Sequence, residues 1–137
     1  MPVRLPPPDR LGAFIHLLGI RFTKGDYGYC ECVLEVTEKL LNYVKTLHGG
    51  VFSTLADTGM AAALYTTFEE GELPATIEIK VNYLGTVTAG VLSCQSTVIQ
   101  KSGTIAFVES EIKNDGRLVA KATGTFRVYR PPAAEAG

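Results

Sequence analysis

The chain has 137 residues and a formal net charge of −1, with 46% hydrophobic and 20% charged residues, as in one ordinary globular domain. No basic tract is present, which argues against a nucleic-acid-binding surface. No apolar run is long enough for a transmembrane helix, and the proline-rich N-terminus lacks the apolar core of a signal peptide. We expect one cytoplasmic domain over residues 1–137, without a membrane partner, and with flexible tails at about 1–8 and 131–137.

The three cysteines predict structural thiols. Their number is odd, and the Cys30-Glu31-Cys32 segment lacks the spacing of metal ligands. On a strand, Cys30 and Cys32 point to the same face, where small hydrophobic side chains are usually buried. We therefore expect Cys94 and this pair to bind no metal, in keeping with a cytoplasmic protein.

The first third of the chain predicts a short helix and a hairpin. Asp9 is placed to cap a helix over residues 11–18. Two strand-like runs follow, over 20–24 and 27–36, and the Gly25-Asp26 pair between them predicts the turn.

A long buried helix is the central prediction. The chain after Gly50 has no proline and is rich in alanine, leucine and methionine, which predicts about four helical turns ending near Phe68. Ser53 and Asp57 are four residues apart and share one face of this helix. The other side chains are apolar or small, so we expect the helix to be mostly buried. A carboxylate in such a helix is costly unless it is paired, neutralised or in use.

The start of this helix suggests acyl-transfer chemistry. It begins at Gly49-Gly50, without the Ser, Thr, Asp or Asn side chain that usually binds the first amides. Free amides at a helix N-terminus can bind a polarised oxygen, so with the carboxylate they predict an acyl-transfer site. Asp57 lies seven residues after Gly50, roughly 10 Å further along the axis, too far for both to reach one carbonyl carbon. The site is therefore expected to combine groups from two subunits.

The rest of the chain predicts four strands. The alternating run 76–84 is typical of a half-buried strand, and Asn114-Asp115-Gly116 is a strong hairpin signal. The other strands are expected over 91–100, 105–113 and 117–130. The predicted fold class is α+β, with a curved, mostly antiparallel sheet wrapped around one long central helix. A small sheet of this kind keeps open edges, which are often closed by a second copy.

The segment from Asn42 through His48-Gly49-Gly50 to Asp57 resembles the hotdog-fold acyl-CoA thioesterases, specifically the phenylacetate-degradation (PaaI-type) branch. The likeness lies in an Asn, an HGG triplet and a helical Asp at matching spacing, and it covers roughly residues 20–130. One departure is Lys45, where members of the branch commonly have glycine.

The resemblance implies hydrolysis of an acyl-CoA thioester to a free acid and CoA. Asp57 would be the general base, or less favourably the nucleophile, and the Gly49-Gly50 amides would form the oxyanion hole. Asn42 would lie near the thioester or the attacking water, and His48 would orient that neighbourhood. Thr76 would help Asp57 hold the water. No cofactor is expected, because CoA is part of the substrate.

Strand alternation qualifies the role of Thr76. It places Thr76 on the polar face with Glu78, so its hydroxyl would reach the site only from the very start of the strand.

The phosphates of CoA require cations, for which Lys101 in the predicted hairpin and Lys80 or Arg127 on strand surfaces are candidates. The candidate substrate-binding residues are Ser53, Thr54, Lys101 and Gly103.

Other interpretations remain open from the residues. His48 could simply form a turn, and Asp57 could be a structural acid bonded to Ser53. A non-catalytic acyl-CoA-binding or sensor protein has the same fold, and so does a hydratase or dehydratase, which requires a catalytic histidine paired with the acid. No histidine is spaced for a serine-hydrolase triad. The expected assembly is a homo-oligomer, either a dimer or a homotetramer of two dimers.

Overall fold

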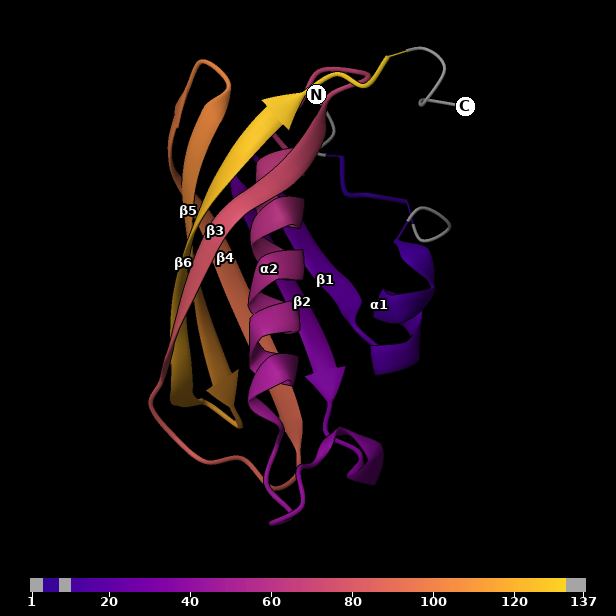
Figure 1. The fold of residues 1–137 in the computed structure, drawn as a ribbon, viewed down its shortest axis with the longest axis vertical. Coiled ribbons are helices and arrows are strands. Elements are labelled where there is room, and N and C mark those ends of the chain that lie inside the picture. Colours follow the sequence, from indigo (N-terminus) through magenta and orange to yellow (C-terminus); the bar gives the residue numbers. More distant parts are fainter. Residues whose placement is uncertain (1–3, 8–10, 133–137) are drawn as a thin grey trace.

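The structure is an antiparallel sheet that curves around one long helix (Figure 1). This computed structural model describes residues 4–7 and 11–132. In chain order its elements are α1 (Gly12–Leu18), β1 (Arg21–Asp26), β2 (Tyr29–Glu35), the short 3-10 helix η2 (Glu38–Leu40), α2 (Gly49–Tyr65), β3 (Leu73–Tyr83), β4 (Val91–Ser102), β5 (Ile105–Asn114) and β6 (Arg117–Tyr129). The strand order is β1-β2-β4-β5-β6-β3. The predicted α+β class, with two strands, one long helix and four more strands, is confirmed.

Helix α2 packs into the concave side of the sheet because the residues that meet there are apolar or small. Every second residue along most of β2, β5 and β6 is buried, as expected of strands with one covered face. Leu55 and Met60 of α2 and Phe126 of β6 are fully buried. Burying each side chain of this size stabilises a fold by about 1.5–3 kcal/mol.

The closest approach of α2 to the sheet occurs at Gly59. A Cβ atom at this position would lie 2.7 Å from Ser96 Oγ and 3.0 Å from Cys94 Sγ. Beneath it the hydroxyls of Ser96 and Ser110 are hydrogen-bonded at 2.6 Å, so these buried polar groups are paired. Cys30, Cys32 and Cys94 are all free and buried around this contact, as predicted for structural thiols.

The predicted turn at Gly25-Asp26 is wrong. Both residues belong to β1, where Gly25 lies opposite Cys30, and the chain turns at Tyr27 and Gly28 instead. Gly28 has a φ of 75°, the left-handed conformation that glycine adopts at little cost. Gly25 is needed for a different reason, because a Cβ atom there would lie 2.9 Å from the side chain of Leu5.

Helix α2 ends at Tyr65, slightly before the predicted end near Phe68. The Thr66 hydroxyl donates to the Ala63 carbonyl at 2.6 Å and accepts the Gly28 N–H at 2.7 Å. A threonine that bonds back to the preceding turn competes with continuation of the helix. The same contacts tie the end of α2 to the β1–β2 turn.

The predicted helix near the N-terminus is confirmed as α1. It begins at Gly12, and the preceding residue, Leu11, gives no side-chain cap. The predicted cap, Asp9, lies outside the described residues, as do 1–3, 8, 10 and 133–137 of the chain. No helix among the described residues is long and apolar enough to cross a bilayer.

Candidate active site

Asp57 and Thr76 meet between α2 and the edge strand β3. The Thr76 hydroxyl donates a hydrogen bond of 2.7 Å to Asp57 Oδ1. Asp57 is only partly buried, and Thr76 is exposed. The expectation of a buried carboxylate is therefore wrong within one protomer, because the described residues cover this part of α2 only in part. The two side chains are in contact, as the role implied for Thr76 requires.

A β-bulge brings Thr76 to this position. Thr76 pairs with Phe126 and Glu78 with Thr125, so Ile77 is an extra residue in β3. Phe126 is buried and faces α2, and Thr76 opposite it faces α2 as well. Simple alternation, which placed Thr76 with Glu78, is wrong because the extra residue reverses the strand's faces at this point.

The pair has the chemistry of a general base held in place. A carboxylate accepts hydrogen bonds at both oxygens, and the Thr76 hydroxyl occupies only Oδ1 of Asp57. None of the hydrogen bonds found among residues 4–7 and 11–132 engages Oδ2. A water molecule bound to this oxygen would be positioned for deprotonation.

The first turn of α2 has a side-chain cap that sequence reasoning missed. His48 is the N-cap residue, and the Gly50 N–H donates to its Nδ1 at 2.8 Å. The Val51 N–H donates to the His48 carbonyl at 3.0 Å. The prediction that the helix starts without a capping side chain is thus wrong, because an imidazole nitrogen replaces the usual oxygen acceptor. Within the described chain, no acceptor is found for the Gly49 N–H.

Asn42 shapes the loop that leads to His48. Its Oδ1 accepts the N–H groups of Val44 and Thr46 at 3.0 and 3.1 Å, and its Nδ2 donates to Thr46 Oγ1 at 2.8 Å. Lys45 adopts a φ of 65°, so the turn forms although the residue is not glycine. Among the described residues, the hydrogen bonds of Asn42 all lie within this loop, and none joins it to Asp57.

Tyr83 was not predicted as a site residue, yet it braces the start of α2. Its hydroxyl donates to the Gly49 carbonyl at 3.1 Å and lies 3.2 Å from Ser53 Oγ. Ser53 Oγ and Thr54 Oγ1 themselves donate to the carbonyls of Gly49 and Gly50, at 3.4 and 2.9 Å. The two predicted substrate-binding hydroxyls therefore bond to their own helix. The sequence signal for Tyr83 was its place at the end of an alternating strand.

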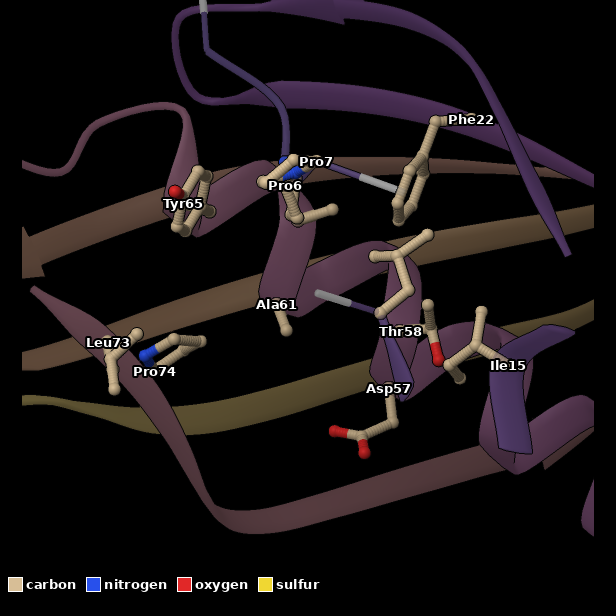
Figure 2. Close-up of a pocket in the computed structure, with 12 residues that line it drawn as sticks. Pro6, Pro7, Ile15, Phe22, Asp57, Thr58, Ala61, Tyr65, Leu73 and Pro74 are labelled. Atoms are coloured by element: carbon tan, nitrogen blue, oxygen red, sulfur yellow. The ribbon is translucent and has the colours of Figure 1, made fainter. Parts of the chain in front are cut away.

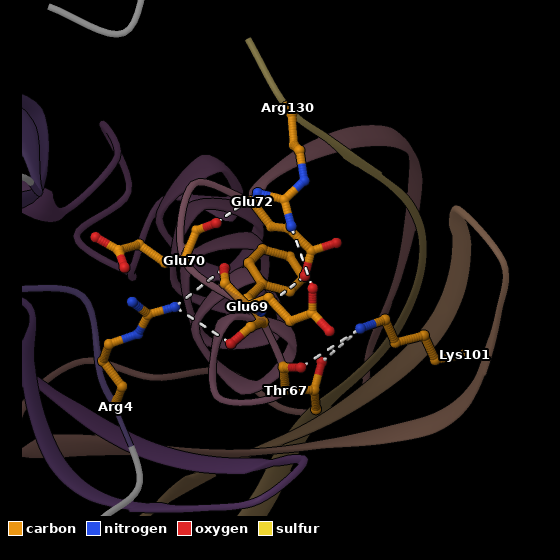
Figure 3. Close-up of polar contacts among 8 residues, drawn as sticks. Arg4, Thr67, Glu69, Glu70, Glu72, Lys101 and Arg130 are labelled. Carbon is orange, nitrogen blue, oxygen red and sulfur yellow. Dashed lines mark hydrogen bonds and ion pairs between the residues drawn. The ribbon is translucent and has the colours of Figure 1, made fainter.

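Lys101 and Gly103 lie at the opposite end of α2 from Gly49. Lys101 Nζ donates to Thr67 Oγ1 at 3.3 Å, beside the loop that follows the helix (Figure 3). Gly103, with a φ of 62°, forms the β4–β5 turn. Because α2 has 17 residues and is about 25 Å long, one protomer does not bring Lys101 or Gly103 to the start of the helix.

Asp57 lines an apolar pocket of about 280 Å³ (Figure 2). One side of the pocket is α2, and the others are the N-terminal segment, α1, the start of β3 and one residue of β1. The lining residues are Pro6, Pro7, Leu11, Ile15, Phe22, Asp57, Thr58, Ala61, Ala62, Tyr65, Leu73 and Pro74. Apart from Asp57 and Thr58, their side chains are aliphatic or aromatic, so the carboxylate adjoins a space suited to an apolar group.

Comparison with known proteins places these features in a family. The sequence model of the Thioesterase superfamily matches residues 44–121, more than half of the chain. A Pseudomonas aeruginosa protein provisionally assigned as an esterase is 30% identical over 130 residues, covering 93% of this chain and 97% of that protein. Human acyl-coenzyme A thioesterase 13 is 29% identical over 101 residues, covering 72% of this chain and 71% of that enzyme.

The solved structures agree with the sequence relatives. A Ralstonia eutropha protein related to phenylacetic acid degradation, provisionally assigned as a thioesterase, has a TM-score of 0.81 and 27% identity. The match covers 89% of this chain and 91% of that one. The resemblance to hotdog-fold thioesterases of the phenylacetate-degradation type is therefore confirmed. The chain belongs to the Thioesterase superfamily and is a hydrolase of thioester bonds.

Proposed function

We propose that the protein hydrolyses acyl-CoA thioesters to a free acid and CoA, in a site that two copies of the chain share. The observation that carries this proposal is the hydrogen bond between Thr76 and Asp57 beside an apolar pocket. The similarity to human acyl-coenzyme A thioesterase 13 supports a CoA ester as the substrate. The reaction requires no cofactor beyond the CoA of the substrate.

Asp57 acts as the general base in this proposal. Its carboxylate removes a proton from a water molecule, and the water oxygen attacks the thioester carbonyl carbon. The carbonyl oxygen becomes an oxyanion, the C–S bond then breaks, and the thiolate of CoA receives the proton. Thr76 holds the carboxylate through Oδ1, so the lone pairs of Oδ2 serve the water. Direct attack by Asp57 on the carbonyl carbon is the alternative route.

The oxyanion is bound by the first amides of α2 from the partner subunit. Residues 50 and 57 are about 10 Å apart along one helix, so the carboxylate and the amides of one chain cannot serve the same carbonyl. The Gly49 amide is the leading donor, since the Gly50 amide is bonded to His48 Nδ1. The Gly50 amide can bind the oxyanion as well only when the His48 imidazole turns away from it. Tyr83 and Ser53 donate to the Gly49 carbonyl, which directly follows the proposed donor amide, and so hold the first turn of α2 in place.

The edge strand β3 is the proposed contact between the two copies. It carries Thr76, and its Ile77 is 57% exposed, so the unpaired edge presents an apolar side chain. Pairing β3 with a second β3 would cover this edge and bring the second α2 close to Asp57. We expect a dimer or a tetramer of two dimers. Lys101 and Gly103 lie near the C-terminal end of α2, so they contact CoA only if the bound CoA extends that far along a helix. The buried free thiols fit a cytoplasmic location.

The test is turnover of acyl-CoA by Asp57→Asn, followed with a thiol-detecting dye. We expect kcat to fall by about 10²–10⁴-fold, because the amide cannot accept the proton from water. The matched control is Asp26→Asn, which changes an exposed carboxylate that forms a surface ion pair with Lys24 at 3.9 Å and should leave kcat unchanged. Near-normal turnover by Asp57→Asn would contradict the proposed role.

The same experiment separates the other functions of this fold. Binding of acyl-CoA without release of thiol by the unmodified protein would favour a sensor. Water addition to an unsaturated acyl-CoA without thiol release would favour a hydratase. Size-exclusion chromatography with light scattering gives the assembly, and full activity of a monomer would contradict the shared site.

A further inference from the structure

The pocket beside Asp57 follows one face of α2. Asp57, Ala61 and Tyr65 are each four residues apart, so their side chains line one stripe of the helix. From Asp57 to Tyr65 the stripe advances eight steps of the helix, about 12 Å along the axis. Figure 2 shows these three side chains in turn along the helix, with Leu73 and Pro74 of β3 on one side. The carboxylate is thus at one end of the pocket and the Tyr65 ring at the other.

A short N-terminal segment, Arg4–Pro7, forms the wall opposite this stripe, and we name it the strap. Pro6 and Pro7 line the pocket. Leu5 packs onto Gly25 of β1, where a Cβ atom would come within 2.9 Å of it. The absence of a side chain at Gly25 therefore lets the strap lie close to β1.

Arg4 fastens the strap to the far end of the pocket. Its guanidinium lies 5.0 Å from the centre of the Tyr65 ring, within the range of a cation–π contact. Its Nη2 also donates to the carbonyls of Phe68 and Glu69, at 3.2 and 3.3 Å (Figure 3). Arg4 therefore holds both the strap and the Tyr65 ring against the end of α2.

The volume and lining of the pocket select the group that fits. An apolar cavity of about 150 Å³ binds benzene, which has six heavy atoms. The 280 Å³ space is nearly twice as large, so it holds roughly ten heavy atoms, as in a single ring with a short linker or a chain of similar size. A second carboxylate in the acyl group would lie among apolar side chains near the Asp57 carboxylate, because the lining residues carry no positive charge. The nearby Arg4 guanidinium already binds the carbonyls of Phe68 and Glu69.

We propose that the acyl group of the substrate lies in this pocket between α2 and the strap, and that Tyr65, held by Arg4, limits its length. The preferred substrate is then a CoA ester of an uncharged, apolar acyl group of roughly ten heavy atoms, carbonyl included. This inference rests on the proposed function and deepens it. Tyr65 is a specificity-determining residue and takes no part in the chemistry.

The test is kcat/KM across acetyl-, hexanoyl-, octanoyl-, dodecanoyl-, phenylacetyl- and succinyl-CoA. For the unmodified protein we expect the highest values with hexanoyl-, octanoyl- or phenylacetyl-CoA, and at least about tenfold lower values with dodecanoyl- and succinyl-CoA. The ratio of octanoyl to phenylacetyl distinguishes a chain from a ring. A profile that is highest for succinyl- or dodecanoyl-CoA would overturn the inference.

Variants of the stripe locate the effect. Ala61→Leu fills the middle of the pocket, so the ratio of octanoyl to acetyl activity should fall by about tenfold or more. Tyr65→Ala opens the far end and should raise dodecanoyl relative to octanoyl activity, and Arg4→Ala should act in the same direction more weakly. Tyr65→Phe keeps the ring and should preserve the profile, as should Tyr27→Ala, a change at a tyrosine that is 77% exposed and outside the pocket.

The possible failures are distinguishable. If Ala61→Leu and Tyr65→Ala both keep the unmodified profile while acetyl-CoA is still hydrolysed, the acyl group binds elsewhere and the proposed function stands. If the unmodified protein releases thiol from none of the esters, the proposed function fails. In that case calorimetry would measure the binding of octanoate to the unmodified protein and to Ala61→Leu. Loss of binding in the variant would support the pocket as the acyl site, and equal binding by both proteins would overturn it.

Discussion

The two faces of α2 differ in what their small residues do. On the face toward the sheet, Gly59 lets the helix approach the hydroxyl of Ser96 and the thiol of Cys94. On the other face, Ala61 leaves the space between Asp57 and Tyr65 open. The missing side chain of Gly59 allows close packing, whereas the short side chain of Ala61 leaves a pocket. A helix can therefore be rich in small residues for two opposite reasons, and only its neighbours tell them apart.

The largest effect is expected on the pocket face, from Thr76→Val. Removing the hydroxyl takes a hydrogen bond from the Asp57 carboxylate, worth about 1.5–3 kcal/mol, which corresponds to a fall of about 10- to 150-fold in kcat. Thiol release at saturating acyl-CoA measures it. Thr123→Val, on the opposite face of the sheet beside Lys80, is the matched control. Equal activity of the two variants would show that the Thr76 contact is structural only.

On the sheet face, Gly59→Ala should reduce stability without touching the chemistry. The new Cβ atom would lie 2.7 Å from Ser96 Oγ, and such overpacking costs about 1–3 kcal/mol. The middle of this range exceeds the gain of about 1 kcal/mol in helix propensity, so the net effect is a loss of stability. Chemical denaturation monitored by circular dichroism measures the loss. Thr58→Ala, on the pocket face, should change the free energy of unfolding by less than about 0.5 kcal/mol. An unchanged or higher stability for Gly59→Ala would contradict the close contact.

Alkaline pH probes the same buried side. Burial raises the pKa of the Cys30 thiol from 9.0 to about 12. The unfolded chain therefore loses this proton first, so the stabilising contribution of the neutral thiol is complete below pH 9 and disappears as the pH rises toward 12. Cys30→Ala should make the free energy of unfolding fall less steeply over this interval. Identical slopes for the two proteins would refute a neutral buried thiol.

The smallest effect concerns the loop before α2, which belongs to neither face. Lys45 has a φ of 65°, a conformation that costs about 1 kcal/mol with a side chain and little with glycine. Lys45→Gly should therefore be more stable than Lys45→Ala by about 0.5–1 kcal/mol. Both variants lose the exposed contact with Glu38, so their difference isolates the backbone. Greater stability for the alanine variant would contradict the left-handed turn.

The sequence predicted the helices and strands well because both depend on residues that are close in the chain. The composition of α2 and the alternation along β5 and β6 could be read without knowing which segments pack against them. Asp57 was found in the same way, as an acid in an otherwise apolar helix. The hairpin at Asn114-Asp115-Gly116 was predicted from its turn residues and joins β5 to β6 as expected.

The parts that were missed depend on contacts between distant segments. The bulge at Ile77 arises in the pairing of β3 with β6, and Gly25 is a glycine because Leu5 packs on it. The wall of the pocket comes from the strap, which lies far from α2 in the sequence. The cap by His48 was missed because the usual cap residues carry oxygen acceptors, whereas here the acceptor is a ring nitrogen.

The single extra residue in β3 means that the position of a skipped pairing, not the identity of a side chain, decides which way Thr76 faces. If Ile77 were taken into the ladder opposite Phe126, Thr76 would move one place along β6 and its hydroxyl would turn to the far side of the sheet. Deleting Ile77 has the opposite outcome, because Thr76 and Glu78 then follow one another opposite Phe126 and Thr125 and keep their present faces. The proposed site therefore tolerates the loss of this residue but not its entry into the regular pairing.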